Sequence, residues 1–216
     1  MSIMSKLVLP LVGIGGVGVA GLGGYSLLKK SWETPKEQTF KDKYSHAILA
    51  SGDDLWATKF KDLKDGSNPT HSRLLEAQTK FKSNDSDENA KLLQKEGCED
   101  IYNSKLEGSN YLQDFRKYCA KLVSNAVKGT WIVDDTANSG KWDTKLNSLK
   151  THNGSLDTSL ETLKGKLNAN SGANVDANKR GELKNWCDGI KGEIFMGDKD
   201  IKFTQAQLYC VENPGT

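Results

Sequence analysis

Four cysteines are the residues whose chemistry the sequence specifies most directly, because they can be oxidised in pairs. They are Cys98, Cys119, Cys187 and Cys210. A turn-forming segment lies midway between the first two, at residues 108–110, and another lies midway between the last two, at residues 197–199. Two cysteines at equal distances from a turn lie level with each other across an antiparallel helical hairpin, where a disulfide can form. Of the three pairings that four cysteines allow, this geometry favours Cys98–Cys119 and Cys187–Cys210.

The alternative to disulfides is four buried free thiols, since cysteine is often buried and these cysteines fall on apolar helix faces. We expect disulfides, because the count is even, the pair occurs twice and a candidate membrane segment precedes them. These features favour an oxidising compartment outside the cytosol. A loop of about twenty residues closed by a disulfide adds roughly 3 kcal/mol to stability. No C-x-x-C motif occurs, so neither thioredoxin-like redox chemistry nor an ordinary zinc site is indicated.

The sequence contains no recognisable catalytic constellation. The three histidines, His46, His71 and His152, have no metal-ligand spacing and no neighbouring nucleophile signature, and we predict that they are scattered and exposed to solvent. Trp56 and Trp142 could be ligand platforms, but their helical spacing with leucines predicts a place in the core. The sequence therefore predicts no catalytic residue, no cofactor-binding residue and no metal ligand, in a protein that is not an enzyme.

Residues 1–30 form a candidate membrane anchor. Residues 7–28 contain no charged side chain, Lys6 precedes them, and Lys29 and Lys30 follow. As a helix, a stretch of this length spans about 33 Å, enough for the hydrocarbon core of a bilayer. We predict a signal-anchor helix that contacts the lipid bilayer through residues 7–28. A cleaved signal peptide, with Ala20 at the cleavage site, is the alternative.

Glycines in this segment match the dinucleotide-binding pattern G-x-G-x-x-G twice, at residues 13–18 and 16–21. A dinucleotide fold needs a strand before the glycines, an amphipathic helix after them and an acidic residue at the end of a second strand. None of these accompanies the glycines here, so the matches reflect composition. Nucleic-acid binding is also not indicated, since 30 basic and 28 acidic residues nearly balance and no long basic run occurs.

Beyond the anchor, apolar residues recur at helical spacing and predict an all-α fold in which one pattern occurs twice. Residues 56–64 are echoed by residues 142–150, with tryptophan, lysine and leucine in the same order, and two cysteines follow in each copy. Corresponding tryptophans are 86 residues apart, first cysteines 89 and second cysteines 91. The nearly constant offset predicts a tandem duplication, with helical unit 1 at residues 31–129 and unit 2 at residues 130–216. Chance recurrence of helical patterning is the alternative.

Two apolar stripes carry more specific expectations. A helix near the end of the first unit, ending at Gly129, should carry on one face Tyr111, Phe115, Tyr118, Cys119 and Leu122. A helix in the second unit should echo the helix of Cys98, with apolar residues at helical spacing that are Leu183, Trp186, Cys187, Ile190 and Ile194.

Several segments together resemble a large paralogous family of uncharacterised membrane-anchored proteins from haemotrophic mycoplasmas. Beside the short glycine-rich N-terminus, they are Tyr44–Leu49, Asp54–Trp56, Cys98–Tyr102, Tyr111–Cys119, Leu183–Cys187 and Leu208–Cys210. The resemblance covers nearly the whole length. It implies a membrane-anchored protein of a wall-less bacterium, displayed toward the host and diversified among paralogues. The family supplies no catalytic residue to transfer to this chain.

The sequence therefore predicts an all-α protein with one N-terminal transmembrane helix and two tandem helical units. The function that fits best is a surface-exposed antigen or host-interaction module, with the C-terminal region outside the cell and a host-cell surface or an antibody as partner. A helical scaffold that holds a lipid or small ligand is the alternative, and it requires a sizeable apolar cavity near Trp56 or Trp142. No oligomeric state follows from the sequence.

Overall fold

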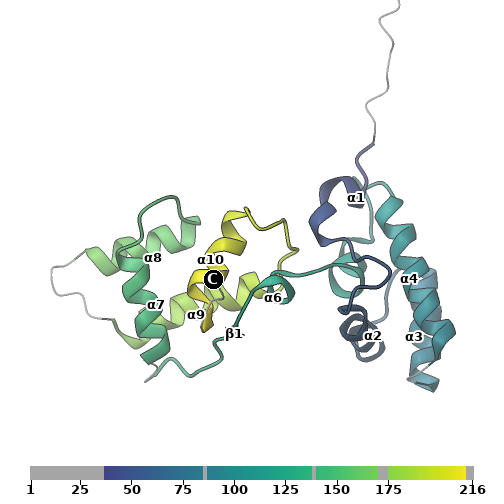
Figure 1. Ribbon diagram of the computed structural model, residues 1–216, viewed down its shortest axis with the longest axis horizontal. Helices are drawn as coiled ribbons and strands as arrows, with labels where there is room; N and C mark the ends of the chain where they lie inside the picture. The colour runs from purple at the N-terminus through teal and green to yellow at the C-terminus, as the bar shows by residue number, and fades with distance from the viewer. Residues whose placement is uncertain (1–36, 85–86, 138–139, 170–174, 213–216) are drawn as a thin grey trace, which may run out of the picture. The chain divides into compact units, whose positions relative to one another are not determined.

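The computed structural model describes residues 37–84, 87–137, 140–169 and 175–212. The described residues are mostly helical, which confirms the all-α class (Figure 1). Among them, no helix is both long enough and apolar enough to cross a membrane. The predicted anchor at residues 1–30, with its span 7–28, lies outside the described residues, as do both glycine motifs.

The first group of helices surrounds one hydrophobic core. Its elements are α1 (Phe40–Lys43), a 3₁₀ turn (Ser45–Ala47), α2 (Trp56–Asp65), α3 (Ser72–Ser83), α4 (Glu88–Asn103), α5 (Leu112–Asp114) and a π-helical turn (Phe115–Cys119). Helices α3 and α4 lie side by side (Figure 1). The large side chains that are fully buried here are Phe40, Leu63, Leu74, Phe81, Ile101, Tyr102, Phe115 and Tyr118. The predicted core position of Trp56 is confirmed, since only 5 % of this residue is exposed.

The second group of elements surrounds a second core. It contains α6 (Val123–Ala126), β1 (Thr130–Trp131), α7 (Gly140–Lys150), α8 (Thr158–Asn168), α9 (Ala177–Lys191), α10 (Ile201–Tyr209) and β2 (Val211–Glu212). β1 and β2 are antiparallel, with Thr130 opposite Glu212 and Trp131 opposite Val211. Trp142 is fully buried in this core, as predicted, beside Leu146, Leu149, Leu160, Leu167 and Leu183.

Aspartate side chains determine where the helices of both groups begin. Asp87 accepts a hydrogen bond from the backbone N–H of Ala90 at the start of α4, and Asp176 accepts one from Lys179 at the start of α9. Each carboxylate satisfies a backbone donor that has no partner within its helix, and its negative charge is favourable at the positive end of the helix dipole. α4 and α9 are the longest helices of the described residues, and each carries the first cysteine of a pair.

The prediction of one continuous helix from Tyr111 toward Gly129 is wrong. After the π-helical turn the chain becomes extended, with Ala120 bridged to Ile48 in antiparallel fashion and the Lys121 N–H donating to the carbonyl of Ala47 at 2.9 Å. The Lys121 carbonyl in turn accepts from the N–H of Phe195 at 3.0 Å. Backbone groups that are used in such inter-segment bonds cannot also form the helical i to i−4 pattern, so α6 is only a short helix.

Both predicted disulfides are formed, so the alternative of four free thiols is not what the structure contains. Cys98 is bonded to Cys119 and Cys187 to Cys210, with Cα–Cα distances of 5.3 and 5.5 Å. Each bond joins a long helix, α4 or α9, to the element that packs against it, which is the π-helical turn or the residue that follows α10. All four cysteines are fully buried, which makes each disulfide part of a core.

We expect each disulfide to contribute similarly to stability, because the two loops have sequence separations of 21 and 23 residues. The paired change Cys98→Ala with Cys119→Ala should lower the free energy of unfolding by about 3 kcal/mol, and Cys187→Ala with Cys210→Ala by about the same amount. Urea denaturation of the full-length chain, followed by circular dichroism, measures both. A loss below about 1 kcal/mol for either pair would show that its core is held by packing alone.

Candidate functional site

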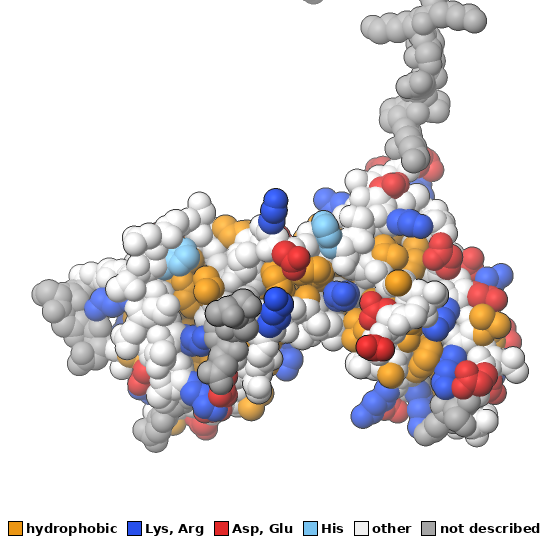
Figure 2. Space-filling view, in the orientation of Figure 1, with side chains coloured by type: hydrophobic (Ala, Val, Ile, Leu, Met, Phe, Trp, Pro, Cys, Tyr) orange, Lys and Arg blue, Asp and Glu red, His pale blue; other side chains and the backbone are white. Residues whose placement is uncertain are grey.

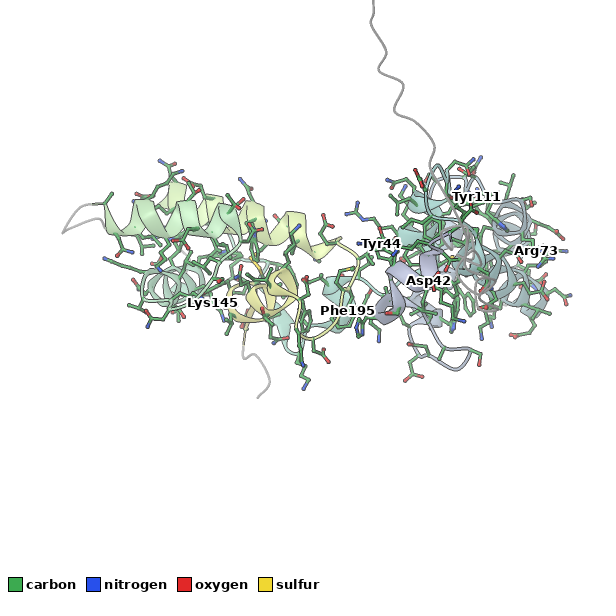
Figure 3. The ribbon with its side chains drawn as sticks, turned by 90° about the horizontal axis from the view of Figure 1, so that it is seen from above. Asp42, Tyr44, Arg73, Tyr111, Lys145 and Phe195 are labelled. Atoms are coloured by element: carbon green, nitrogen blue, oxygen red, sulfur yellow. A yellow bond between two sulfur atoms is a disulfide. The ribbon has the colours of Figure 1, made fainter. Side chains whose placement is uncertain are left out.

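In each core a lysine side chain donates a hydrogen bond to a backbone carbonyl near the disulfide, from α2 in the first core and from α7 in the second. Lys59 on α2 is 1 % exposed, and its ammonium donates to the carbonyl of Lys117 at 3.2 Å. Lys145 on α7 (Figure 3) donates to the carbonyl of Leu208 at 2.8 Å. In both cases the accepting residue lies two positions before the second cysteine of the disulfide. In both cores, a lysine-to-carbonyl hydrogen bond therefore holds the segment that carries the second cysteine.

The two lysines are electrostatically similar as well. Burial lowers the pKa of Lys59, and the nearby carboxylate of Asp62, 3.7 Å from the ammonium, partly opposes this effect. Burial also lowers the pKa of Lys145. Both ammonium groups donate to backbone carbonyls, so each lysine provides a hydrogen-bond donor for the segment that ends in the second cysteine.

A second repeated contact connects the disulfide-linked element to the start of the neighbouring helix. Asp114, which is 4 % exposed, accepts hydrogen bonds from the backbone N–H groups of Thr70 and His71 at 2.8 Å each, at the start of α3. Gln205 on α10 accepts from the N–H of Asp157 at 2.9 Å, at the start of α8. These buried groups replace water as partners for donors that the helices themselves cannot satisfy.

The histidines differ from the predicted scattered, exposed arrangement. His46 is exposed, as predicted, but His71 is 8 % exposed and lies against the Tyr111 ring, with Nε2 3.8 Å from the Asp100 carboxylate. His152 is partly buried, and its Nδ1 lies 2.8 Å from the hydroxyl of Tyr209. Burial raises the pKa of Tyr209 to about 12, so its hydroxyl keeps its proton at neutral pH.

The site of His71 combines a buried imidazole with several charged neighbours. Arg73 pairs with Asp100 at 3.2 Å, and Figure 3 places Arg73 and Tyr111 in the same region of the molecule. Burial lowers the pKa of His71 below its ordinary 6.5, against the opposing effect of the Asp100 and Asp114 carboxylates, while Arg73 lowers it further. The described residues contain no group of three or more His, Cys, Asp or Glu side chains that could hold a metal ion.

The surface has several shallow hollows of different character. One, of about 460 Å³, lies between α2, α3 and α4 and is lined by Ala57, Phe60, Lys61, Lys64, Asp65, Phe81 and Lys91. Its wall is aromatic, since Phe60 stacks on Trp56 and lies 5.8 Å from Phe81, and the Lys91 ammonium lies 5.9 Å from the centre of the Phe60 ring. On the face shown in Figure 2, basic and acidic side chains are interspersed around α1–α4.

The most polar hollows lie along α9 in the second core, and we call them together the α9 groove. One part, of about 360 Å³, is lined by Ser159, Leu160, Leu163, Glu182, Asn185 and Trp186. The adjoining part, of about 240 Å³, shares Ser159, Asn185 and Trp186 and adds Asp157, Gly189, Ile190, Glu193 and Lys202. The groove therefore follows one face of α9, with Trp186 in the wall of both parts.

The predicted apolar stripe lies on α9 as far as Ile190, but α9 ends at Lys191, so Ile194 lies beyond the helix, where it is bridged to Leu122. Leu183, Cys187 and Ile190 are buried, but Trp186 is only partly buried, at the edge of the core. Its indole N–H donates to the carboxylate of Asp157 at 3.1 Å, and the same carboxylate oxygen accepts from the N–H of Ser159 at 3.0 Å. Helical periodicity placed Trp186 within about one hundred degrees of the core face, and it could not distinguish the centre of that face from its edge.

No protein-family model, no curated protein and no solved structure matches the chain.

The buried acceptor Asp114 should be more important for stability than its exposed counterparts. Asp114→Ala leaves two backbone N–H groups at the start of α3 without their acceptor, and should lower the free energy of unfolding by about 1–3 kcal/mol. Gln205→Ala removes one neutral acceptor and also the amide that donates to the carbonyl of Ser155 at 3.0 Å, and should cost about 1–2 kcal/mol. Asp188→Ala is the control, because the Asp188 carboxylate pairs with Lys184 on an exposed helix face and its loss should cost about 0.5 kcal/mol or less. Equal effects for Asp114→Ala and Asp188→Ala in urea denaturation would contradict this interpretation.

His71 should make stability depend on pH. Because its pKa is lowered in the folded protein, the unfolded state takes up the proton first as the pH falls below 6.5, and the free energy of unfolding should decrease from there toward the folded pKa. His71→Gln should flatten this part of the profile, whereas His46→Gln, at an exposed position, should keep it. Melting temperatures between pH 7.5 and pH 4.5 measure the difference. A steeper profile in His71→Gln would show that the sign is reversed.

Proposed function

We propose that the chain is a membrane-anchored protein whose helical part is displayed outside the cell as an interaction module, recognised by a host-cell surface or by antibodies. In this proposal residues 7–28 cross the bilayer as a signal-anchor, and no catalytic activity is involved. The proposal includes membership of the family of haemotrophic mycoplasma proteins that the sequence resembles.

The observation that carries the proposal is the pair of buried disulfides. Disulfides persist in oxidising environments and are rare in the reducing cytosol, and here one is built into each of the two cores. A chain that depends on both for its packing is suited to the space beyond the membrane. The uncharged stretch at residues 7–28 offers a way to remain attached there.

We also propose that the two cores are tandem copies, with boundaries close to residues 31–129 and 130–216. The support is a set of contacts that recur at nearly constant offsets: Lys59 and Lys145 to a carbonyl, Asp114 and Gln205 to a helix start, and both disulfides. Duplication predicts polar contacts between corresponding elements, whereas chance recurrence of helical patterning predicts only recurring apolar positions. Duplication followed by divergence is an ordinary way for a displayed module to vary its surface while it keeps its core.

A helical scaffold for a small ligand is the second candidate function. Its support is the hollow between α2, α3 and α4, whose wall of Phe60 and Phe81 adjoins Trp56. Lys61 and Lys91 at this hollow would suit an apolar ligand with a negatively charged end. Trp142 and Trp56 themselves are packed in their cores, so this candidate rests on an open surface hollow rather than on an enclosed cavity.

Surface display is tested by labelling intact cells that produce the full-length chain with a membrane-impermeant amine reagent. Exposed lysines such as Lys61, Lys117 and Lys128 should be labelled before the cells are permeabilised, and Lys59, which is 1 % exposed, should not be. Peptide mass spectrometry reads out each site, and a cytoplasmic protein that stays unlabelled serves as the control. Labelling of the exposed lysines only after permeabilisation would contradict the proposal.

A further inference from the structure

The α9 groove combines an oriented tryptophan with polar side chains whose hydrogen-bonding capacity is unused. Asn185 makes no hydrogen bond through its amide within the described residues, and the Ser159 hydroxyl makes none either. Trp186 is the opposite case, because its indole N–H is bound to Asp157 and its ring orientation is therefore fixed. A fixed ring beside free amide and hydroxyl groups is a surface prepared for a ligand that has both C–H and O–H groups.

The first core has no aromatic residue at the position that corresponds to Trp186. Gly97 occupies the corresponding place on α4, one position before the first cysteine, as Trp186 does on α9. There the core closes without any side chain, since a Cβ atom built on Gly97 would lie 2.9 Å from a Leu74 methyl carbon and 3.3 Å from the Cβ of Arg73. In the second core Trp186 instead stands at the rim and lines both parts of the groove. The ring therefore packs against the edge of the second core and also lines the groove, where it is available to a ligand.

The chemistry of the groove narrows the class of ligand. A sugar ring presents C–H groups on one face, which suit the electron-rich face of an indole, and hydroxyl groups at its edge, which suit carboxylate, amide and hydroxyl partners. Asp157, Asn185 and Glu193 provide such partners along the groove, and so does Glu182, one oxygen of which is paired with Lys166 at 2.7 Å. The three carboxylates outnumber the single lysine of the lining, Lys202, and so disfavour an anionic sugar. A single ring does not form the aromatic cage that selects a quaternary ammonium group. The elongated shape along α9 suits a chain of sugar units rather than one.

We propose that the α9 groove binds a neutral oligosaccharide, with Trp186 stacked on a sugar ring and Asn185 hydrogen-bonded to its hydroxyl groups. This inference rests on the proposed display of the helical part outside the cell, because it gives the displayed module a glycan of the host surface as its partner. Trp186 is then the residue that dominates affinity, as buried or oriented tryptophans commonly do at binding sites.

The test uses the full-length chain in a polyoxyethylene detergent, whose head group carries neither sugar nor charge. The probes are neutral tetrasaccharides built from glucose, N-acetylglucosamine and N-acetyllactosamine units, a sialylated form of the last, and choline as the quaternary ammonium. Titration calorimetry and saturation-transfer NMR should detect at least one neutral tetrasaccharide, bound more tightly than the sialylated form or choline. Trp186→Ala should weaken binding about tenfold or more, and Asn185→Ala about threefold to tenfold.

Two controls keep the result interpretable. Asn147→Ala changes an exposed asparagine on α7 in the same core, outside the groove, and should leave binding unchanged. Trp186→Phe retains a ring and should bind more tightly than Trp186→Ala, which separates stacking from misfolding, and melting curves check that each variant is folded.

Binding of none of the neutral tetrasaccharides would overturn the proposal. So would equal binding by Trp186→Ala and the unchanged chain, or a preference for the sialylated form or choline. Each of these results is independent of the cell-labelling experiment, so glycan binding and surface display can fail separately.

Discussion

The covalent link between a long helix and the short element packed against it is the constraint on which both cores depend. In the first core the partner of α4 is a π-helical turn of five residues, and in the second the partner of α9 is the nine-residue α10. Neither is long enough to be stable as an isolated helix. The disulfide places each against its long helix, which allows Tyr102 and Tyr118 in one core, and Tyr209 in the other, to be buried nearly completely. The Tyr102 hydroxyl then donates to the carbonyl of Cys119 at 2.6 Å. This hydrogen bond holds Cys119 in place and so supports the Cys98–Cys119 disulfide.

Part of this arrangement could be predicted from the sequence because it depends on local spacing. The distance of each cysteine from a turn was sufficient to predict the pairing, and the tryptophans at helical spacing with leucines were correctly expected in the core. Other features depend on contacts between segments far apart in the chain. The break after Cys119 arises because Ala120 and Lys121 pair with residues 47 and 48, and nothing in the sequence around position 120 signals it. The burial of His71 likewise depends on Tyr111, Asp100 and Asp114, which come from three later segments.

The two cores differ at corresponding positions of their long helices, α4 and α9. Gln94, fully buried on α4, donates to the carbonyls of Lys59 and Tyr118, whereas its counterpart on α9 is the apolar Leu183. The first core thus satisfies its backbone through buried polar side chains, and the second relies more on leucine packing. The residue before the first cysteine also differs between the cores. In the first core it is Gly97, which allows α3 and α4 to pack closely, and in the second it is Trp186, whose ring lies at the edge of the core. The sequence repeat shows that Gly97 and Trp186 correspond. How far Trp186 is exposed depends on how α8 packs against α9, which the sequence pattern does not show.

The oxidation state of the cysteines in the cell connects the fold with the proposed location, since disulfides persist in oxidising compartments outside the cytosol. It is measured by alkylating intact cells before and after reduction and mapping the peptides by mass spectrometry. Our account predicts peptides that join Cys98 to Cys119 and Cys187 to Cys210, with no alkylation at any of the four before reduction. Four alkylated free thiols, or peptides that join a cysteine of one core to a cysteine of the other, would contradict it.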